Sequence, residues 1–299
     1  MNRYRGRFAP SPTGALHFGS LVAAVGSYLE AKTRGGAWLV RIEDLDPPRE
    51  QPGAAALILR TLEACGMSWD GEILYQSRRG PAYRAALARL QAQGLVYVCG
   101  CSRREIADSG PGADGALIYP GTCRTGLAPG RTPRAARLRV GDETIAFDDA
   151  VQGTLIQNLG EEVGDFVLQR ADGPVAYQLA VVVDDAEQGI TDVVRGADLI
   201  ESTPRQIYLQ RLLGLPSPRY LHLPAAVNAA GEKLSKQTLA APVDGLDPVP
   251  ALAQVMDFLG QAPPPQLGRA TLAGFWDWAL SHWDAKRIAR QRSLRAPSN

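Results

Sequence analysis

The stretch RFAPSPTGALHFGS, residues 7–20, predicts how the fold of this 299-residue chain begins. Its apolar first residues end a short strand, and its prolines and first glycine form a loop. Apolar residues at helical spacings then predict a helix over 16–32. We expect His17 and Gly19 in the first turn of that helix, where unpaired backbone N–H groups and the positive dipole end favour a phosphate. Because strand–loop–helix units are common, this stretch alone is also compatible with an ordinary structural turn.

A second stretch, KLSKQ at residues 233–237, favours the phosphate interpretation. Only four of the 32 basic residues are lysines: Lys32, Lys233, Lys236 and Lys286. Two of these four lie three positions apart in this one loop. A lysine ammonium is a compact, mobile point charge that can follow a phosphate during its transfer. A solvated surface loop is the structural alternative.

Together the two stretches resemble the paired signature motifs of class I aminoacyl-tRNA synthetases, and the residues around them are similar to the glutamyl branch. The resemblance covers roughly residues 4–260. It departs from the general motifs at Ser20, where a second histidine is usual, and at Leu234 and Gln237, where methionine and serine are usual. The resemblance implies an α/β fold. A Rossmann-like nucleotide-binding domain is interrupted by a small zinc-bearing insertion and followed by a short helical C-terminal part, without an anticodon-binding domain.

The pattern of apolar residues divides the chain in the same way. Strands over 4–9 and 37–43, joined by the first helix, predict a parallel βαβ unit. Further elements are expected as helices at 53–67, 79–93, 203–213, 251–259 and 270–282, and as strands at 95–98, 136–140, 165–169, 190–195 and 221–224. Combined with these elements, the resemblance implies the first half of the catalytic domain at 1–98, an acceptor-contacting insertion with the zinc site at 99–173, the second half at 174–225, and the lysine loop with C-terminal helices at 226–299.

Polar residues that follow the expected strands form the candidate glutamate site, because ligands of parallel sheets bind beyond the carboxyl ends of the strands. The resemblance implies that Glu43 holds the α-amino group of bound glutamate and that Arg7 contacts a carboxylate. It also implies that Tyr177 and Arg195 complete the pocket. The remaining residues that the resemblance places against glutamate are Phe8, Ala9, Pro10 and Ser11.

Arg195 has a second interpretation, in which it forms a structural salt bridge to Asp184 or Asp198. Arg195 lies at the end of an apolar strand, and an unpaired buried arginine is energetically costly. We therefore expect a carboxylate partner of some kind, from the protein or from the substrate.

Three of the four cysteines, Cys99, Cys101 and Cys123, fall within 25 residues. In an intracellular protein such a cluster indicates a metal site rather than a disulfide. Tetrahedral zinc needs a fourth ligand, and the residues alone leave water or Asp114 open. The resemblance implies Tyr119 instead, in a structural zinc site. Three free thiols near a turn are the alternative.

Composition limits the class of protein. Hydrophobic residues make up 45% of the chain and charged residues 21%, as in ordinary globular proteins, and the net charge is only +1. No apolar run approaches the roughly 18 residues of a membrane span, and no signal-peptide pattern is present. We therefore expect a cytoplasmic protein that is not embedded in a membrane. Without an apolar heptad pattern, we expect a monomer.

Two segments carry local positive charge. The tail over 286–295 has five basic residues and no acidic one, which fits either a contact to a phosphate backbone or a solvated terminus. The expected insertion, which the resemblance implies contacts tRNA, carries Arg103, Arg104, Arg124, Arg131 and Arg134. This clustering is weak support for RNA binding on its own.

The resemblance implies that glutamate attacks the α-phosphate of ATP, which is bound with Mg²⁺, to give glutamyl-adenylate without tRNA. His17, Lys233 and Lys236 are then the catalytic residues, and His17, Gly19 and Lys236 bind ATP. Within the glutamyl branch the chain is most similar to a short paralogue that transfers glutamate to the queuosine base in the anticodon of tRNA(Asp). About sixty residues follow the lysine loop, too few for a typical anticodon-binding domain.

Three other functions stay open. The chain could be a truncated glutamyl-tRNA synthetase that charges the 3′ end of tRNA(Glu). It could be an adenylyl-transfer enzyme of the same fold with a small-molecule acceptor. It could also be a catalytically silent RNA-binding paralogue, which the presence of His17, Lys233 and Lys236 argues against.

Overall fold

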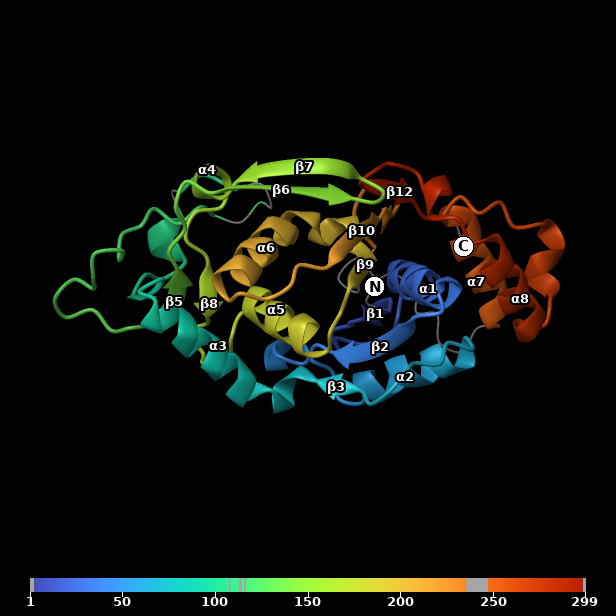
Figure 1. Cartoon of the computed structure of the whole chain (residues 1–299), viewed down its shortest axis with the longest axis horizontal. Helices are drawn as coiled ribbons and strands as arrows, with labels where there is room; N and C mark the ends of the chain where they lie inside the picture. Colours follow the sequence, from blue (N-terminus) through green and yellow to red (C-terminus); the bar gives the residue numbers. More distant parts are fainter. Residues whose placement is uncertain (1–2, 108, 113–114, 116, 235–246, 298–299) are drawn as a thin grey trace.

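The computed structural model describes residues 3–107, 109–112, 115, 117–234 and 247–297 (Figure 1). The α-helices are α1 (Phe18–Thr33), α2 (Ala54–Ala64), α3 (Gly80–Ala92), α4 (Leu159–Glu162), α5 (Tyr177–Glu187), α6 (Thr203–Leu212), α7 (Pro248–Phe258) and α8 (Leu272–His282). The strands are β1 (Arg5–Phe8), β2 (Ala37–Ile42), β3 (Leu74–Tyr75), β4 (Val96–Cys99), β5 (Ala135–Leu138), β6 (Thr144–Asp149), β7 (Gly153–Asn158), β8 (Val167–Gln169), β9 (Asp192–Gly196), β10 (Arg219–Leu223), β11 (Ala225–Val227) and β12 (Ser293–Arg295).

The predicted βαβ unit is confirmed. Strands β1 and β2 pair in parallel, from Arg5 opposite Ala37 to Phe8 opposite Val40, and α1 connects them. Strand β3 extends this sheet on the far side of β2. The helix begins two residues later than predicted, because His17 has an extended backbone and caps the helix with its side chain.

A second sheet has the strand order β7-β6-β10-β9, with β9 and β10 parallel. The two sheets meet at Thr191 and Arg5. The backbone N–H of Arg5 donates to Thr191 Oγ1 at 2.9 Å, and the N–H of Thr191 donates to the Arg5 carbonyl at 2.9 Å. The hairpin β6–β7 belongs to the predicted insertion, yet it joins this sheet where Asp149 lies opposite Tyr220. The domain boundaries stay a prediction.

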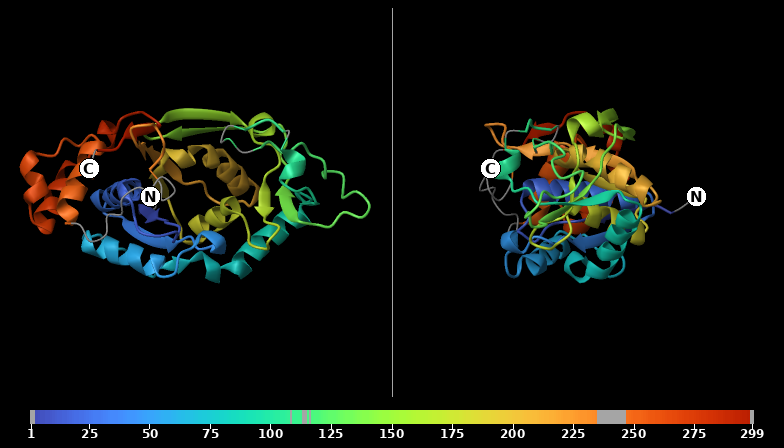
Figure 2. Two further views of the ribbon diagram at one scale, coloured as in Figure 1. Left: turned by 180° about the vertical axis from the view of Figure 1, so that it is seen from behind. Right: turned by 90° about the vertical axis from the view of Figure 1, so that its left-hand side faces the viewer.

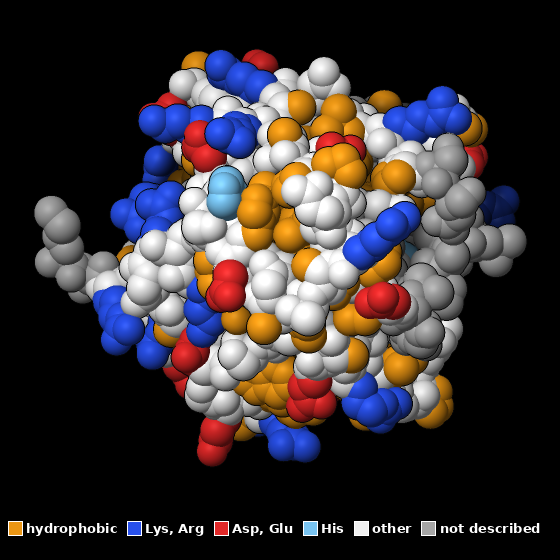
Figure 3. All heavy atoms as spheres, turned by 90° about the vertical axis from the view of Figure 1, so that its right-hand side faces the viewer, with side chains coloured by type: hydrophobic (Ala, Val, Ile, Leu, Met, Phe, Trp, Pro, Cys, Tyr) orange, Lys and Arg blue, Asp and Glu red, His pale blue; other side chains and the backbone are white. Residues whose placement is uncertain are grey.

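The rest of the predicted insertion forms one end of the molecule (Figures 1 and 2). Strands β4, β5 and β8 make an antiparallel sheet there, and β4 ends at Cys99. The opposite end consists of α7 and α8. On the face seen from that end, hydrophobic side chains occupy the middle and basic side chains lie toward the edges (Figure 3).

Two main hydrophobic clusters form the core. One joins β1, β2, α1 and α2 to α7 and α8, and the other surrounds α3, α5 and α6. Trp276 is buried in the first cluster, where its Nε1 donates to the Cys65 carbonyl at 2.9 Å. Trp278 and Trp283 pack against the same cluster. Within the described part of the chain, no helix has both the length and the apolar character that crossing a membrane requires.

Candidate active site

A cleft of about 780 Å³ opens where β1, β2, β9 and β10 end. This is the carboxyl edge of parallel strands, where ligands of α/β sheets bind. The cleft is lined by every described residue that the sequence assigned to glutamate, ATP or catalysis: Arg7, Phe8, Ala9, Pro10, Ser11, His17, Gly19, Glu43, Tyr177, Arg195 and Lys233. Lys236 and Gln237 lie outside the described residues.

The first motif forms one wall of the cleft through the N-terminus of α1. His17 is the N-cap residue rather than a residue of the first turn, and its Nδ1 accepts a hydrogen bond from the Ser20 N–H at 3.2 Å. The Ser20 hydroxyl lies 3.1 Å from His17 Nε2. Ser20, which stands where the general motif has a second histidine, therefore holds the imidazole of His17 in place. At Gly19 a Cβ would lie 3.3 Å from the same ring, so a side chain at this position would press on the imidazole of His17.

A buried ion network holds Arg7 and Glu43 at the back of the cleft. Arg7 Nε and Nη2 donate to the two carboxylate oxygens of Asp185 at 3.1 and 3.3 Å. Arg41 Nη1 donates to Asp185 at 2.7 Å, and Arg41 Nη2 donates to Glu43 at 3.2 Å. Burial opposes ionisation of Asp185, but the two guanidinium groups hold its pKa at about 2. For Glu43, burial outweighs Arg41 and raises the pKa above its usual range.

Arg195 is held by neutral groups. Its Nε donates to His222 Nε2 at 3.0 Å, and its Nη2 donates to Thr203 Oγ1 at 2.8 Å. Its Nη1 lies 3.4 Å from the hydroxyl of Tyr177, at the start of α5. Arg195 is only 5% exposed, yet no described carboxylate lies within ion-pair distance of it. The salt bridge to Asp184 or Asp198 that sequence left open is therefore absent from the described structure.

Those two carboxylates have other partners. Asp184 accepts from Gln76 at 2.8 Å and from Tyr83 at 2.7 Å. Asp198 forms an ion pair with Lys233, whose side chain is about half exposed at the mouth of the cleft. A buried cation that faces a cleft without a protein carboxylate can take its counter-ion from a ligand.

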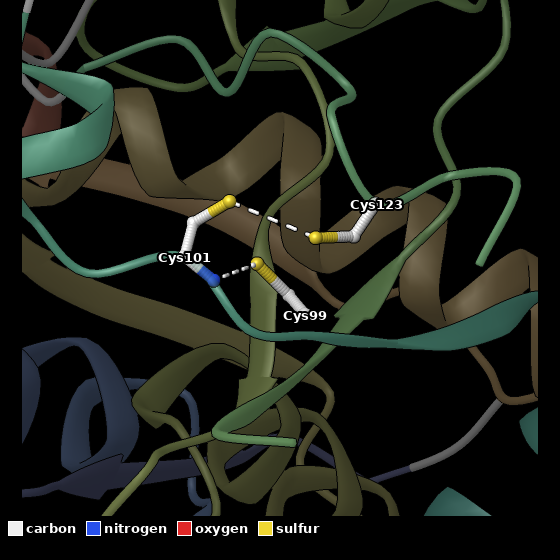
Figure 4. A group of neighbouring side chains, drawn as sticks. All are labelled: Cys99, Cys101 and Cys123. Carbon is white, nitrogen blue, oxygen red and sulfur yellow. Dashed lines mark hydrogen bonds between the residues drawn. The ribbon is translucent and has the colours of Figure 1, made fainter. Parts of the chain in front are cut away.

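The cysteine cluster lies outside the cleft, in the predicted insertion (Figure 4). The sulfur atoms of Cys99, Cys101 and Cys123 all lie within 4.8 Å of one another. The hydroxyl of Tyr119 lies 3.4 Å from the sulfurs of Cys99 and Cys101, and it accepts from the Cys123 N–H at 2.9 Å. The three cysteines could therefore hold a metal ion, and the Tyr119 hydroxyl is the neighbouring oxygen that could supply a fourth ligand. Asp114 lies outside the described residues.

The residues around Cys99 favour its thiolate, whereas burial raises the pKa of Cys101. Burial would raise the pKa of Cys99, but hydrogen bonds from Tyr119 and Arg137 lower it to about 7. The Arg137 guanidinium also lies 3.9 Å from the centre of the Tyr119 ring, which fixes the orientation of that ring.

Sequence reasoning missed several residues that hold the site together: Arg41, Asp149, Asp185, Thr203 and His222. A signal for Asp185 was available, because it follows the apolar run at 179–183 directly after Asp184. His222 gave a similar signal inside an apolar strand. In both cases the pattern indicates a buried polar group, but it does not tell which partner that group has.

Comparison with known proteins agrees with this geometry. Residues 3–116 and 122–249 match the family of tRNA synthetases class I (E and Q), catalytic domain. Over 98% of its length the chain is 59% identical to the glutamyl-Q tRNA(Asp) synthetase of Aromatoleum aromaticum, of which it covers 93%. It is 60% identical to the enzyme of the same name from Dechloromonas aromatica, with 99% of both chains covered.

The fold agrees as well. The crystal structure of glutamate-tRNA synthetase from Elizabethkingia anophelis superposes with a TM-score of 0.81 at 26% identity, covering 98% of this chain and 68% of that one. The predicted α/β synthetase fold is therefore confirmed. The chain belongs to the class I tRNA synthetases of the E and Q type, and it is a ligase of the aminoacyl-tRNA synthetase kind.

Proposed function

We propose that this protein activates glutamate with ATP to glutamyl-adenylate without tRNA, and then transfers the glutamyl group to the queuosine base in the anticodon of tRNA(Asp). The observation that carries the first step is Arg195, a buried cation that faces the cleft without a described carboxylate partner. Glutamate offers two carboxylates and one ammonium group, which suits a cleft lined by arginines and by Glu43.

Each end of the substrate has a matching group. Arg195 Nη1, together with the hydroxyl of Tyr177, is placed to donate to a glutamate carboxylate. Glu43 accepts the α-amino group, since an ammonium ion brought to this buried carboxylate favours its ionised form. The stretch from Arg7 to Ser11 closes the back of the pocket around the substrate.

ATP occupies the other half of the cleft in this proposal. The N-terminus of α1, with His17 and Gly19, receives the phosphates, and Mg²⁺ accompanies the nucleotide. The glutamate carboxylate attacks the α-phosphorus, and the bond to pyrophosphate breaks. The backbone N–H groups, His17, Lys233 and Lys236 neutralise the charge that develops on the leaving group.

Support for the acceptor comes from the relatives, which are named for glutamyl-Q and tRNA(Asp) and match the chain over nearly all of its length. We propose the predicted insertion, residues 99–173, as the part that contacts the acceptor. Arg103, Arg104 and Arg134 are exposed there, while Arg124 and Arg131 form ion pairs with Asp165 and Glu105.

We propose zinc as the metal at Cys99, Cys101, Cys123 and Tyr119, with a structural role, because the cluster is remote from the phosphates in the proposed mode of binding. Zinc would tie β4 to the loop that carries Tyr119 and Cys123. The protein would act as a monomer in the cytoplasm, where ATP and tRNA are available.

Glutamate-dependent ATP–pyrophosphate exchange, measured with and without tRNA, tests the first step. Exchange without tRNA is expected, followed by transfer of labelled glutamate to tRNA(Asp) that carries queuosine and not to the same tRNA without it. Exchange that requires tRNA(Glu), with label at its 3′ end, would instead identify a truncated charging enzyme. Absence of exchange under both conditions would overturn the proposal.

Lys236 can be tested separately. Lys236→Ala should lower the rate of exchange by roughly 100-fold, because it removes a charge that stabilises the transition state, while the KM for glutamate changes little. Lys286→Ala is the matched control, as it removes another of the few lysines. Equal rates in both variants would remove Lys236 from the mechanism.

A further inference from the structure

His222 lies behind Arg195 and is completely buried. Its Nδ1 lies 2.6 Å from Asp149 Oδ2, and its Nε2 accepts from Arg195 Nε at 3.0 Å. The hydroxyl of Thr203 lies 3.3 Å from the same Nε2. Asp149, His222 and Arg195 thus form a chain of hydrogen bonds from the turn of the β6–β7 hairpin to the cleft.

The carboxylate at the start of this chain is rigidly oriented. Asp149 Oδ1 accepts three backbone N–H groups, from Val151 at 3.0 Å, Gln152 at 2.8 Å and His222 at 3.1 Å. Because three donors hold Oδ1, the other oxygen has to face the imidazole. An ionised carboxylate only accepts hydrogen bonds, so it places the imidazole proton on Nδ1.

The imidazole then passes this orientation on to the guanidinium. With its proton on Nδ1, His222 presents the lone pair of Nε2 to Arg195, whose Nε–H can only donate. Burial lowers the pKa of His222 to about 4, although Asp149 opposes this shift, so the ring is neutral near pH 7. The bond to His222 fixes the Nε edge of Arg195, and the bond to Thr203 fixes Nη2. The remaining nitrogen, Nη1, faces Tyr177 and the cleft.

We propose that Asp149 and His222 are positioning residues for the substrate carboxylate. Asp149 selects the tautomer of His222, and His222 aims Arg195 into the cleft. A carboxylate in direct contact with Arg195 would neutralise the guanidinium and compete with the substrate. The imidazole avoids this competition, because it orients the arginine and keeps the balancing charge of Asp149 on its far side.

This inference rests on the proposed function, in which Arg195 holds a carboxylate of glutamate. It predicts how three variants differ. Asp149→Asn turns its amide nitrogen toward His222, because the three backbone donors retain the oxygen. The amide donates to Nδ1, the imidazole proton moves to Nε2, and two donors then face each other at Arg195. His222→Asn loses the acceptor for Arg195, whereas His222→Gln can retain an acceptor there.

The test is the KM for glutamate and the KM for ATP in pyrophosphate exchange, measured for these three variants and for Arg195→Ala. Asp149→Asn and His222→Asn should raise the KM for glutamate by roughly tenfold to 100-fold, His222→Gln less than His222→Asn, and the KM for ATP should stay within twofold. Asp165→Asn is the matched control, since Asp165 is a buried, hydrogen-bonded carboxylate in the insertion. Its KM for glutamate should not change.

The outcomes separate the two proposals. If the wild-type protein shows no glutamate-dependent exchange, the proposed function fails. If Arg195→Ala raises the KM for glutamate but Asp149→Asn and His222→Asn behave like Asp165→Asn, the positioning role is wrong and the proposed function stands.

A measurement on the unaltered protein tests the proposal even if the variants do not fold. Nitrogen-15 spectra of the three histidines report which ring nitrogen carries the proton. The proposal requires His222 to be protonated on Nδ1 alone at pH 7. A proton on Nε2 would overturn it.

Discussion

Arg7 and Arg195 line the same cleft and are both nearly buried, at 3% and 5% exposure, but their partners are opposite in kind. Arg7 is bound through two nitrogens to the carboxylate of Asp185, which also binds Arg41. Arg195 is bound by an imidazole, two hydroxyls and a backbone carbonyl. The first arginine has a protein carboxylate as its counter-ion, whereas the second has none among the described residues.

This difference indicates a division of roles. Arg7 and Arg41 both pair with Asp185, and Arg41 also pairs with Glu43, so each of these two arginines has a protein carboxylate as its partner before any substrate binds. Such a network stabilises the walls of the cleft, and removal of one member leaves buried charge uncompensated. The Arg195 side gains its counter-ion only when a carboxylate enters. We expect stability to depend mainly on the first region and substrate affinity mainly on the second.

The largest effect on stability is expected for Asp185→Asn. The change leaves two buried guanidinium groups facing a neutral amide, and the free energy of unfolding should fall by about 3–5 kcal/mol. Urea unfolding measures this loss. Asp172→Asn is the control, because Asp172 pairs with Arg170 at the surface and its substitution should leave the stability almost unchanged. Equal losses in the two variants would contradict the role of the buried network.

Arg195→Ala should affect substrate binding more than any other change at the cleft. Removal of the charged donor should raise the KM for glutamate by roughly 100-fold, with the KM for ATP unchanged. Pyrophosphate exchange measures both constants, and Arg219→Ala is the matched control. A comparable rise in both Michaelis constants would show that the cleft had collapsed and that Arg195 is not specific for glutamate.

The two regions should also differ in their dependence on pH. The pKa of His222 is about 4 in the folded protein and about 6.5 in the unfolded chain. Its contribution to the free energy of unfolding is therefore complete above pH 6.5 and is lost as the pH falls toward 4. Asp185 has a pKa of about 2 in the folded protein, so its contribution to the free energy of unfolding is lost below about pH 4. Each loss should be on the order of 2 to 3 kcal/mol.

Unfolding free energies measured from pH 7 to pH 2 should therefore fall in two windows. Asp185→Asn should reduce the fall in the lower window, to which other carboxylates with lowered pKa values such as Asp149 and Asp165 also contribute, and His222→Gln should remove the upper window. If one variant removed both windows, the two regions would be a single coupled network and the comparison would not hold.

Metal removal should have the smallest effect on the cleft. A chelator should lower the thermal stability of the region around Cys99, Cys101 and Cys123, because three thiolates would lose their common cation. The KM for glutamate in pyrophosphate exchange should change by less than about twofold, since none of these residues lines the cleft. Tyr119→Phe should weaken the metal without removing a thiolate. A large rise in the KM for glutamate would show that the insertion supports the cleft directly.

Local patterns in the sequence determined much of this protein. The apolar period around residues 7–20 predicted strand, loop and helix, and the strand that follows completed the parallel unit. The three clustered cysteines indicated a metal-binding group, and the structure brings their sulfurs together. The residues assigned to substrate lie around one cleft, because the ends of parallel strands share one edge of a sheet. These features can be predicted because the spacing of apolar residues within a short segment indicates which side chains are buried.

Only the tertiary structure decided which groups become partners. Asp185 binds Arg7 from 178 positions away, and Asp149 binds His222 from 73 positions away. A sequence pattern shows that a polar residue will be buried and therefore needs a partner, but many carboxylates along the chain could meet that need. The choice depends on how separate strands pair, as when β6 joins β10 and carries Asp149 to His222. Sequence thus determined the elements and the location of the cleft, whereas the packing of helix α5 and the pairing of strand β6 decided that Arg7 has a carboxylate partner and that Arg195 has an imidazole.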